Sequence, residues 1–157
     1  GVEEAIAEHL LPLADIVTPN LFELGRLTDK PVDDLDDALS AAEELLIRGP
    51  GLVVVTGVPL GDGAVGLLAV TDETALLATA PRHPVKVFGA GDSFAALLMS
   101  EILAGLPVQD ALSQAGGAIT AITRSAGRLD AHEVDLIGAL HDVAEADPLP
   151  IRDLWAG

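Results

Sequence analysis

The chain has no cysteine and few basic residues. Without a thiol, a disulfide-stapled fold, thiolate catalysis and a cysteine zinc site are all excluded. Its 157 residues include only 8 Lys and Arg against 25 Asp and Glu, a formal net charge of −17, so a surface that binds nucleic acid or an anionic membrane is not expected. No apolar run approaches the roughly 20 residues of a membrane helix, and no charged-then-apolar signal segment opens the chain. These absences favour a cytoplasmic protein without nucleic-acid or membrane partners.

Half of the residues are hydrophobic, which is enough to build the core of one domain over residues 1–157. Strands are expected over 15–19, 52–56, 64–70, 75–79 and 85–88, with 64–70 and 75–79 forming a hairpin. Helices are expected over 3–11, 35–46, 92–104, from 108 onward, and over 132–146. Strands that alternate with helices predict an α/β fold with a mostly parallel sheet. The run from Phe94 to Leu103 is nearly all apolar, which predicts a helix buried between other elements.

A glycine-rich turn at residues 87–94 joins a predicted strand directly to a helix. The backbone N–H groups of Gly89, Ala90 and Gly91 would point off the helix N-terminus, where the helix dipole favours a phosphate. Asp92 stands at the mouth of this turn, where an acid would repel a bound phosphate. Its chemistry there suits a general base that takes a proton from an attacking hydroxyl.

Two other interpretations of this turn remain open. The glycines could form a plain tight turn with Asp92 as a helix N-cap. The sequence Gly91-Asp92-Ser93 also resembles the nucleophile block of GDSL-type esterases, which would make Ser93 the nucleophile. That family usually carries Asp-x-x-His near its C-terminus, whereas the segment 130–132 is one residue too short and His141 has no Asp three residues before it.

A second polar segment follows the first predicted strand. Asn20 and Glu23 lie three residues apart, so one helical turn places both side chains on one face. A carboxylate and an amide at a strand end suit Mg²⁺, which takes one or two carboxylates together with substrate phosphates. The same spacing also suits a capping arrangement in which Thr18 or Asn20 caps the helix.

Taken together, the segments resemble a known enzyme superfamily. Thr18-Pro19-Asn20-x-x-Glu23, a helix ending in Gly49-Pro50, a Val-Val-Val-Thr strand and then Gly-Ala-Gly-Asp-Ser-Phe-Ala-Ala occur in this order in the ribokinase-like (PfkB-type) kinases. The resemblance runs from about residue 11 to 125 and is strongest to bacterial pyridoxal kinases. It implies a three-layer α/β/α fold and ATP-dependent phosphorylation of a hydroxymethyl group, with pyridoxal as the preferred acceptor.

The resemblance also implies roles for single residues. ATP and Mg²⁺ would be the cofactors, with a monovalent cation as a further candidate. Asp92 would be the catalytic base, and Glu23 the residue at the metal. The remaining implied contacts are the anion hole of Gly89, Ala90 and Gly91, the Mg²⁺ and phosphate region of Thr18 and Asn20, the nucleotide-phosphate contacts Thr56 and Gly57, and the nucleotide-pocket residues Val87 and Phe88.

Several functional alternatives stay open beside this interpretation. Pyridoxal kinases often have Thr in place of Ala90, and some close relatives have Lys in place of Thr56, so a hydroxymethylpyrimidine or sugar kinase is the alternative within the superfamily. The chain resembles only the C-terminal, nucleotide-binding half of such an enzyme, and the N-terminal half is expected to be absent. A non-catalytic nucleotide-binding module is therefore a further alternative. The full-length enzyme is expected to be a homodimer.

Overall fold

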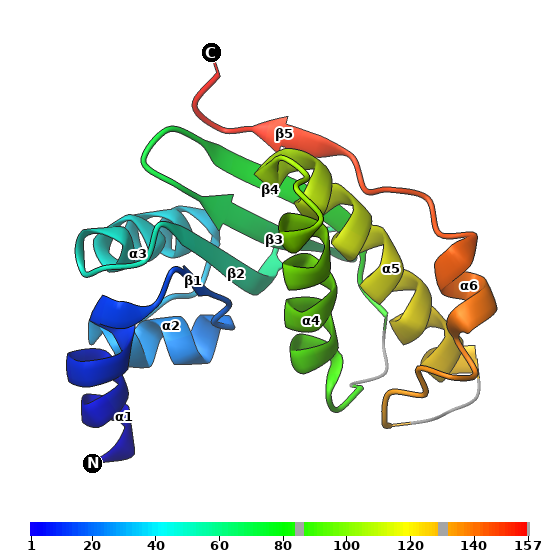
Figure 1. Ribbon diagram of the computed structural model, residues 1–157, viewed down its shortest axis with the longest axis horizontal. Coiled ribbons are helices and arrows are strands. Elements are labelled where there is room, and N and C mark those ends of the chain that lie inside the picture. The colour runs from blue at the N-terminus through cyan, green and yellow to red at the C-terminus, as the bar shows by residue number, and fades with distance from the viewer. Residues whose placement is uncertain (84–86, 129–131, 157) are drawn as a thin grey trace. The chain divides into compact units, whose positions relative to one another are not determined.

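The structure is a computed structural model that describes residues 1–83, 87–128 and 132–156. Figure 1 shows an α/β chain in which runs of helices and runs of strands follow one another along the sequence. The elements are α1 (Val2–Ala5), η1 (Ile6–Leu10), η2 (Leu11–Leu13), β1 (Ile16–Val17), α2 (Leu21–Thr28), α3 (Leu35–Ile47), β2 (Leu52–Pro59), β3 (Ala64–Val70), β4 (Ala75–Pro81), α4 (Ala90–Leu103), α5 (Val108–Arg128), α6 (Leu140–Ala144) and β5 (Ile151–Asp153). Within the described ranges, no helix combines the length and the apolar character needed to cross a membrane.

The five strands form one sheet in the order β1-β2-β3-β4-β5. The sheet is mixed, because β1 pairs with β2 in parallel whereas β2 pairs with β3 antiparallel. The α/β class is therefore confirmed, while the expectation of a mostly parallel sheet is corrected for the pair of β2 and β3. The physical reason is the short connection over residues 60–63, which returns the chain at once and allows only antiparallel pairing.

The contacts of the chain fall into two compact units, residues 1–77 with 152–157 and residues 78–151. In the first unit, α3 packs on β2 and β3. The buried positions of α3 are Ala38, Ala41, Ala42 and Leu45. Small alanine side chains let this helix lie close to the valines and leucines of the strands. The N-cap of α3 is Asp34, with its Oδ1 accepting a hydrogen bond from the Asp37 N–H at 2.9 Å.

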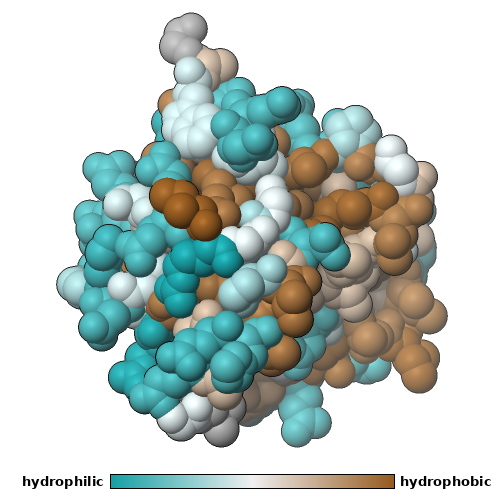
Figure 2. Space-filling view, turned by 60° about the vertical axis from the view of Figure 1, so that its left-hand side comes forward, coloured by the Kyte–Doolittle hydropathy of each residue, from teal (hydrophilic) through white to brown (hydrophobic). Residues whose placement is uncertain are grey.

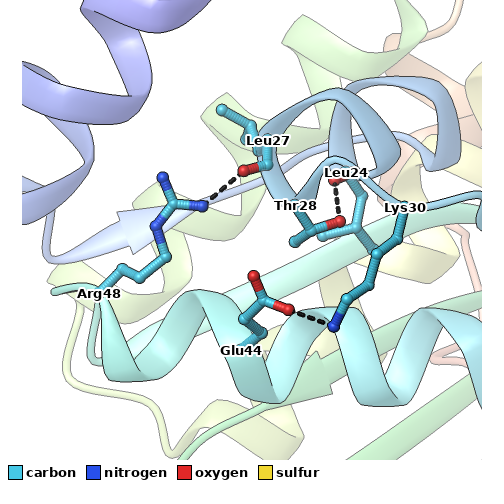
Figure 3. Close-up of polar contacts among 6 residues, drawn as sticks. All are labelled: Leu24, Leu27, Thr28, Lys30, Glu44 and Arg48. Carbon is cyan, nitrogen blue, oxygen red and sulfur yellow. Dashed lines mark hydrogen bonds and ion pairs between the residues drawn. The ribbon is translucent and has the colours of Figure 1, made fainter.

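Helix α2 is tied to α3 by polar contacts at its C-terminal end (Figure 3). The Arg48 guanidinium donates to the carbonyl oxygen of Leu27, one of the last carbonyls of α2. The ammonium of Lys30 pairs with the Glu44 carboxylate on α3. These contacts fix the far end of the helix whose first turn contains Glu23.

The second unit is built on the packing of α4 and α6 against α5. Phe94 and Leu98 are the buried side chains of α4. The expectation that this helix is buried all round is wrong, because Leu103 is 79% exposed and Met99 is also exposed. Although the sequence of α4 is nearly all apolar, the rest of the protein therefore covers only one face of this helix. The opposite face is exposed.

The predicted segments around residue 132 differ from the structure. The expected helix over 132–146 is reduced to α6, because the Asp135 carboxylate accepts a hydrogen bond from the Gly138 N–H and holds a turn before it. Residues 85 and 86 of the expected strand over 85–88 lie outside the described residues, and Phe88 forms a single parallel bridge with Glu133. Strand β5 has no counterpart among the predictions.

The start of the chain also differs from a single helix. The expected helix over 3–11 is divided into α1, the π-helical η1 and the 3₁₀-helical η2. Several apolar side chains of the first unit remain at the surface: Leu10, Leu13, Phe22 and Ile47 are all more than half exposed. Figure 2 shows how apolar side chains, in brown, gather over one side of a face of the molecule. Contiguous exposed apolar area of this kind is typical of a surface that another segment or chain covers.

An ion pair in the second unit makes stability depend on pH. The Arg128 guanidinium, which pairs with the Asp142 carboxylate, lowers the pKa of Asp142 below its ordinary 3.8, and Ser125 and Arg124 act in the same direction. Because the folded-state pKa is lowered, the stabilisation is complete above the unfolded-state pKa and is lost as the pH falls through the folded-state value. We expect Asp142→Asn to lower the melting temperature at pH 7 and to flatten its decline at acid pH.

Thermal melts over a series from neutral to strongly acid pH measure this effect. Asp72→Asn is the matched control, because Asp72 lies exposed in the turn between β3 and β4 without an ion pair among the described residues. Parallel acid profiles for the wild type and Asp142→Asn would contradict the prediction.

Candidate functional site

The polar segment after β1 forms a capping box at the start of α2. Asn20 is the N-cap, and its Oδ1 accepts a hydrogen bond from the Glu23 N–H at 3.0 Å. The Glu23 Oε2 in turn accepts a hydrogen bond from the Asn20 N–H at 2.9 Å. Of the two interpretations of this spacing, the capping arrangement is thus present in the structure. Both side chains are exposed, so the carboxylate is accessible from solvent as well.

This capping box lies beside the end of β2. The Thr56 N–H donates to the Pro19 carbonyl at 2.9 Å, and Asn20 forms a parallel bridge with Thr56. The pairing of β2 is irregular between Thr56 and Val58. Gly57 in this stretch has a φ of +77°, a backbone angle that residues with a side chain rarely adopt. The first unit therefore brings the predicted residues of these two strand ends together, namely Thr18, Asn20, Glu23, Thr56 and Gly57.

A small groove opens on the outer side of this segment. Its volume is about 350 Å³, and it includes Thr18 and Glu23 at its polar side. The rest of its lining is mostly apolar: Ile6, Val17, Pro19, Phe22 and Leu27, with Arg26 at the edge. Strand β1, which contributes Val17 to this groove, is an edge strand of the sheet formed by the described residues.

The glycine-rich turn lies in the second unit and opens α4. Gly89 is the N-cap with a φ of +82°, in the left-handed region, and no side chain caps this end of the helix. Ala90, Gly91 and Asp92 are the first three helical residues, and the first intrahelical bond runs from the Ser93 N–H to the Gly89 carbonyl at 3.0 Å. The first backbone N–H groups of α4 thus have no side-chain cap, which is the arrangement that binds anions at helix N-termini.

The position of Asp92 excludes one of the open interpretations of this turn, in which Asp92 is the N-cap. Asp92 is the third helical residue and not the N-cap, and it is exposed. A carboxylate in the first turn is favoured by the helix dipole, so its presence alone is compatible with a purely structural role. Ser93 lies half-buried next to it, and among the described residues no hydrogen bond joins its hydroxyl to a histidine. Nothing in the described chain therefore favours the esterase interpretation.

The residues before the turn are held by a pairing that the sequence did not reveal. The Phe88 N–H donates to the His132 carbonyl at 2.7 Å, and the Phe88 carbonyl accepts from the Val134 N–H at 3.2 Å. Val87 is half-buried, whereas the Phe88 ring is 61% exposed. A Cβ built on Gly89 would lie 3.6 Å from Val134, which makes Val134 the neighbour of the turn that sequence reasoning missed. No local pattern around 132–134 signals this long-range bridge.

The donor set for a metal is small. In the ranges that the structure describes, no three His, Cys, Asp or Glu side chains form a group that could hold a metal ion by themselves. Glu23 offers one carboxylate. The Asn20 amide and the Thr18 hydroxyl belong to the segment directly before it. Such a set fits a hard cation like Mg²⁺, which keeps several waters and shares its ligands with a bound phosphate.

Comparison with known proteins identifies relatives of this architecture. Residues 1–135 match the family described as phosphomethylpyrimidine kinase. A pyridoxal kinase (PdxY) of Rubrobacter xylanophilus is 38% identical over 157 residues, which is 97% of this chain and 54% of that protein. The crystal structure of pyridoxal kinase from Trypanosoma brucei is similar with a TM-score of 0.87 and 26% identity, over 98% of this chain and 56% of that one.

The fold agrees with a second solved structure. Pyridoxal kinase from Staphylococcus aureus, in complex with AMP-PCP and pyridoxal, has a TM-score of 0.84 at 23% identity, over 98% of this chain and 59% of that chain. These similarities confirm the ribokinase-like α/β fold expected from the sequence. The chain spans about half the length of the relatives that it matches.

The two glycines of the turn predict opposite effects on stability. Gly91 is helical, and a Cβ there would meet nothing within 4 Å among the described residues, so Gly91→Ala should stabilise the chain by about 0.5 kcal/mol. Gly89→Ala should destabilise it by about 1 kcal/mol, because alanine is strained at a φ of +82°. Chemical denaturation of both variants measures the two changes. Equal destabilisation by both substitutions would show that the turn has a different backbone.

Proposed function

Because the chain belongs to the phosphomethylpyrimidine kinase family, we propose that it is the nucleotide-binding half of an ATP-dependent kinase that phosphorylates the hydroxymethyl group of pyridoxal. The observation that carries the proposal is the uncapped N-terminus of α4 with a carboxylate in its first turn. An anion site and a base on one helical turn are the two features that phosphoryl transfer to a hydroxyl requires. The family and the pyridoxal kinase relatives support the acceptor class.

In this proposal the turn at 89–91 binds the transferring phosphoryl group. The N–H groups of Gly89, Ala90 and Gly91 would donate to its oxygens, with the helix dipole adding partial positive charge. The small side chains support this role, since a larger residue at Gly91 would occupy open space in front of the backbone. Preorganised donors of this kind stabilise the charge that develops in the transition state.

Asp92 then acts as the general base. Its carboxylate would accept the proton of the acceptor hydroxyl while the hydroxyl oxygen attacks the γ-phosphorus of ATP, and ADP leaves with the electrons of the broken P–O bond. The exposed position of Asp92 in the first turn supports access of an acceptor to it.

Glu23, with Thr18 and Asn20, would hold Mg²⁺ and the adjacent phosphates, while Thr56 and Gly57 contact the nucleotide phosphates and Val87 and Phe88 line the nucleotide pocket. When bound, Mg²⁺ would neutralise charge on the phosphates. A monovalent cation is a further proposed cofactor. The S. aureus relative that binds AMP-PCP and pyridoxal supports the ATP proposal for this chain.

A hydroxymethylpyrimidine is the second candidate acceptor. The description of the matching family favours it directly. Ala90 weakens the pyridoxal assignment, because pyridoxal kinases often have Thr at that position, without favouring this acceptor in particular. Both acceptors present a hydroxymethyl group on an aromatic heterocycle, so the proposed chemistry at Asp92 is the same for either.

The half-length of the chain bears on its activity. We propose that the complete enzyme is a cytoplasmic homodimer and that its other half supplies most acceptor contacts. The apolar side chains that lie exposed around η1, η2 and α2 support a missing covering segment, as does the edge position of β1.

Substitution of the proposed base tests the mechanism. Asp92→Asn keeps the size of the side chain but cannot accept the proton. In the chain completed by the N-terminal half of the R. xylanophilus relative, we expect kcat to fall by roughly 10²–10⁴-fold while ATP affinity changes little. Steady-state kinetics and ATP titrations measure the two quantities. Ser93→Ala is the matched control, and a loss of turnover there with normal turnover in Asp92→Asn would favour hydrolase chemistry over the kinase.

Completion of the chain tests the proposed division of roles. We expect the 157-residue chain alone to be marginally stable, to self-associate at micromolar concentration, to bind ATP weakly and to form no measurable pyridoxal 5′-phosphate. The N-terminal half of the relative, in cis or as a separate chain, should restore turnover because it completes the sheet and the acceptor pocket. Sedimentation and a pyridoxal phosphate assay measure both outcomes. A monomeric isolated chain that phosphorylates pyridoxal would contradict the proposed division.

A further inference from the structure

We propose that Asp62 is a site of spontaneous isoaspartate formation, in which the backbone nitrogen of Gly63 attacks the side-chain carboxyl of Asp62. This covalent modification is independent of the proposed kinase function. The two positions form the one Asp-Gly sequence of the chain, in the connection between β2 and β3. Glycine permits such an attack most readily, because no side chain crowds its nitrogen and its backbone angles are the least restricted.

The reaction requires water alone as a co-reactant. The Gly63 nitrogen forms a bond to Cγ of the protonated Asp62 carboxyl, and the carboxyl hydroxyl leaves as water with the proton of the N–H. The product is a succinimide ring. Water then adds to one of the two ring carbonyls and breaks the bond from that carbon to the nitrogen. Cleavage at the α-carbonyl leaves the chain connected through Cγ, which is isoaspartate, whereas cleavage at Cγ restores aspartate.

The turn leaves both reacting groups without partners. Asp62 and Gly63 are exposed, and among the described residues the Gly63 N–H donates to no acceptor and the Asp62 carboxylate has no hydrogen bond or ion pair. The turn is closed one residue later, where the Ala64 N–H donates to the Gly61 carbonyl at 2.8 Å. A Cβ built on Gly63 would meet nothing within 4 Å among the described residues, so no described group blocks the approach.

Backbone conformation alone does not distinguish Asp62. Asp29 is the other described non-glycine residue with a positive φ, +55° against +46° at Asp62, and it is exposed as well. The nitrogen that follows Asp29 is different, because the Lys30 N–H donates to the Gly25 carbonyl at 3.1 Å. An N–H held in this way keeps its proton and its direction, so it is not free to attack the preceding side chain.

Helical hydrogen bonding protects Asp92 for the same reason. Asp92 is exposed and is followed by Ser93, whose side chain is small. The Ser93 N–H, however, donates to the Gly89 carbonyl at 3.0 Å as the first intrahelical bond of α4. The proposal therefore selects Asp62 on two grounds, its glycine neighbour and an N–H that has no acceptor.

Isoaspartate would weaken the hairpin that this turn joins. The new linkage adds one carbon atom to the main chain, inside the loop that the bond from the Ala64 N–H to the Gly61 carbonyl closes. The pairing of β2 with β3 begins directly beyond this loop, with Pro59 opposite Val65. Because the length of a tight turn fixes the register of its strands, we expect the modified chain to have a lower melting temperature than the unmodified chain.

Peptide mapping of the aged protein tests the proposal. The folded 157-residue chain is kept in neutral buffer at physiological temperature and sampled over weeks, with its fold followed by circular dichroism. Electron-transfer fragmentation of the peptides locates isoaspartate, and a mass lower by one water marks the succinimide. We expect isoaspartate to accumulate at Asp62, with none at Asp29 or Asp92. In guanidinium chloride, where the bond from the Ser93 N–H is lost, Asp92 should begin to react.

The matched control is Asp62→Glu, which keeps the charge but would have to close a larger ring. This variant should lose the signal. If the signal persists there, it belongs to Asp72, which lies in the same tryptic peptide, and the assignment fails. Isoaspartate at Asp62 in the unfolded chain alone would show that the turn protects the site. Equal rates at Asp62 and Asp92 in the folded chain would show that hydrogen bonding does not select it.

Discussion

The parallel pairing of β1 with β2 is the constraint on which the candidate site depends. Only two residue pairs form it, Ile16 with Leu52 and Val17 with Val53, yet it sets where the chain leaves the sheet toward α2. A slip by one residue would turn every following side chain to the opposite face. Because β2 is buried on both faces, it provides a fixed reference for this register. The capping box and its position beside Thr56 follow from that register.

A single glycine in the connection that leads into β2 makes the pairing of β1 with β2 possible. Gly49, at the end of α3, has a φ of +147°, and a Cβ there would lie 2.6 Å from the Cα of Pro12. Only a residue without a side chain lets the connection from α3 to β2 pass so close to the turn before β1. The Asp15 carbonyl then accepts hydrogen bonds from the N–H groups of Gly51 and Leu52, which start the pairing. The β1–β2 pairing, and with it the position of the capping box, thus depends on the close approach of the backbone at Gly49 to Pro12.

The two compact units present different polar groups. The first unit presents the Glu23 carboxylate, whose Oε2 takes part in the capping box. The second unit presents backbone N–H groups at the N-terminus of α4, which no side chain caps. A cation and an anion are each better served by one of these surfaces than by the other. Gly91 leaves the first turn of α4 open, because a Cβ there would meet nothing within 4 Å among the described residues.

Local sequence by itself determined the α/β class and most element positions, because hydrophobic periodicity acts within a few residues. It also located the two polar segments, but it left Asn20 and Glu23 between a cap and a ligand site, since both uses require the same residues at the same spacing. The extent of α6 was overestimated, and the bridge between Phe88 and Glu133 was missed, because such pairing joins residues far apart in the chain. Only the tertiary structure decided that Asn20 caps α2 next to Thr56, since that proximity arises from strand register and from the close backbone contact at Gly49, neither of which is encoded in any local pattern.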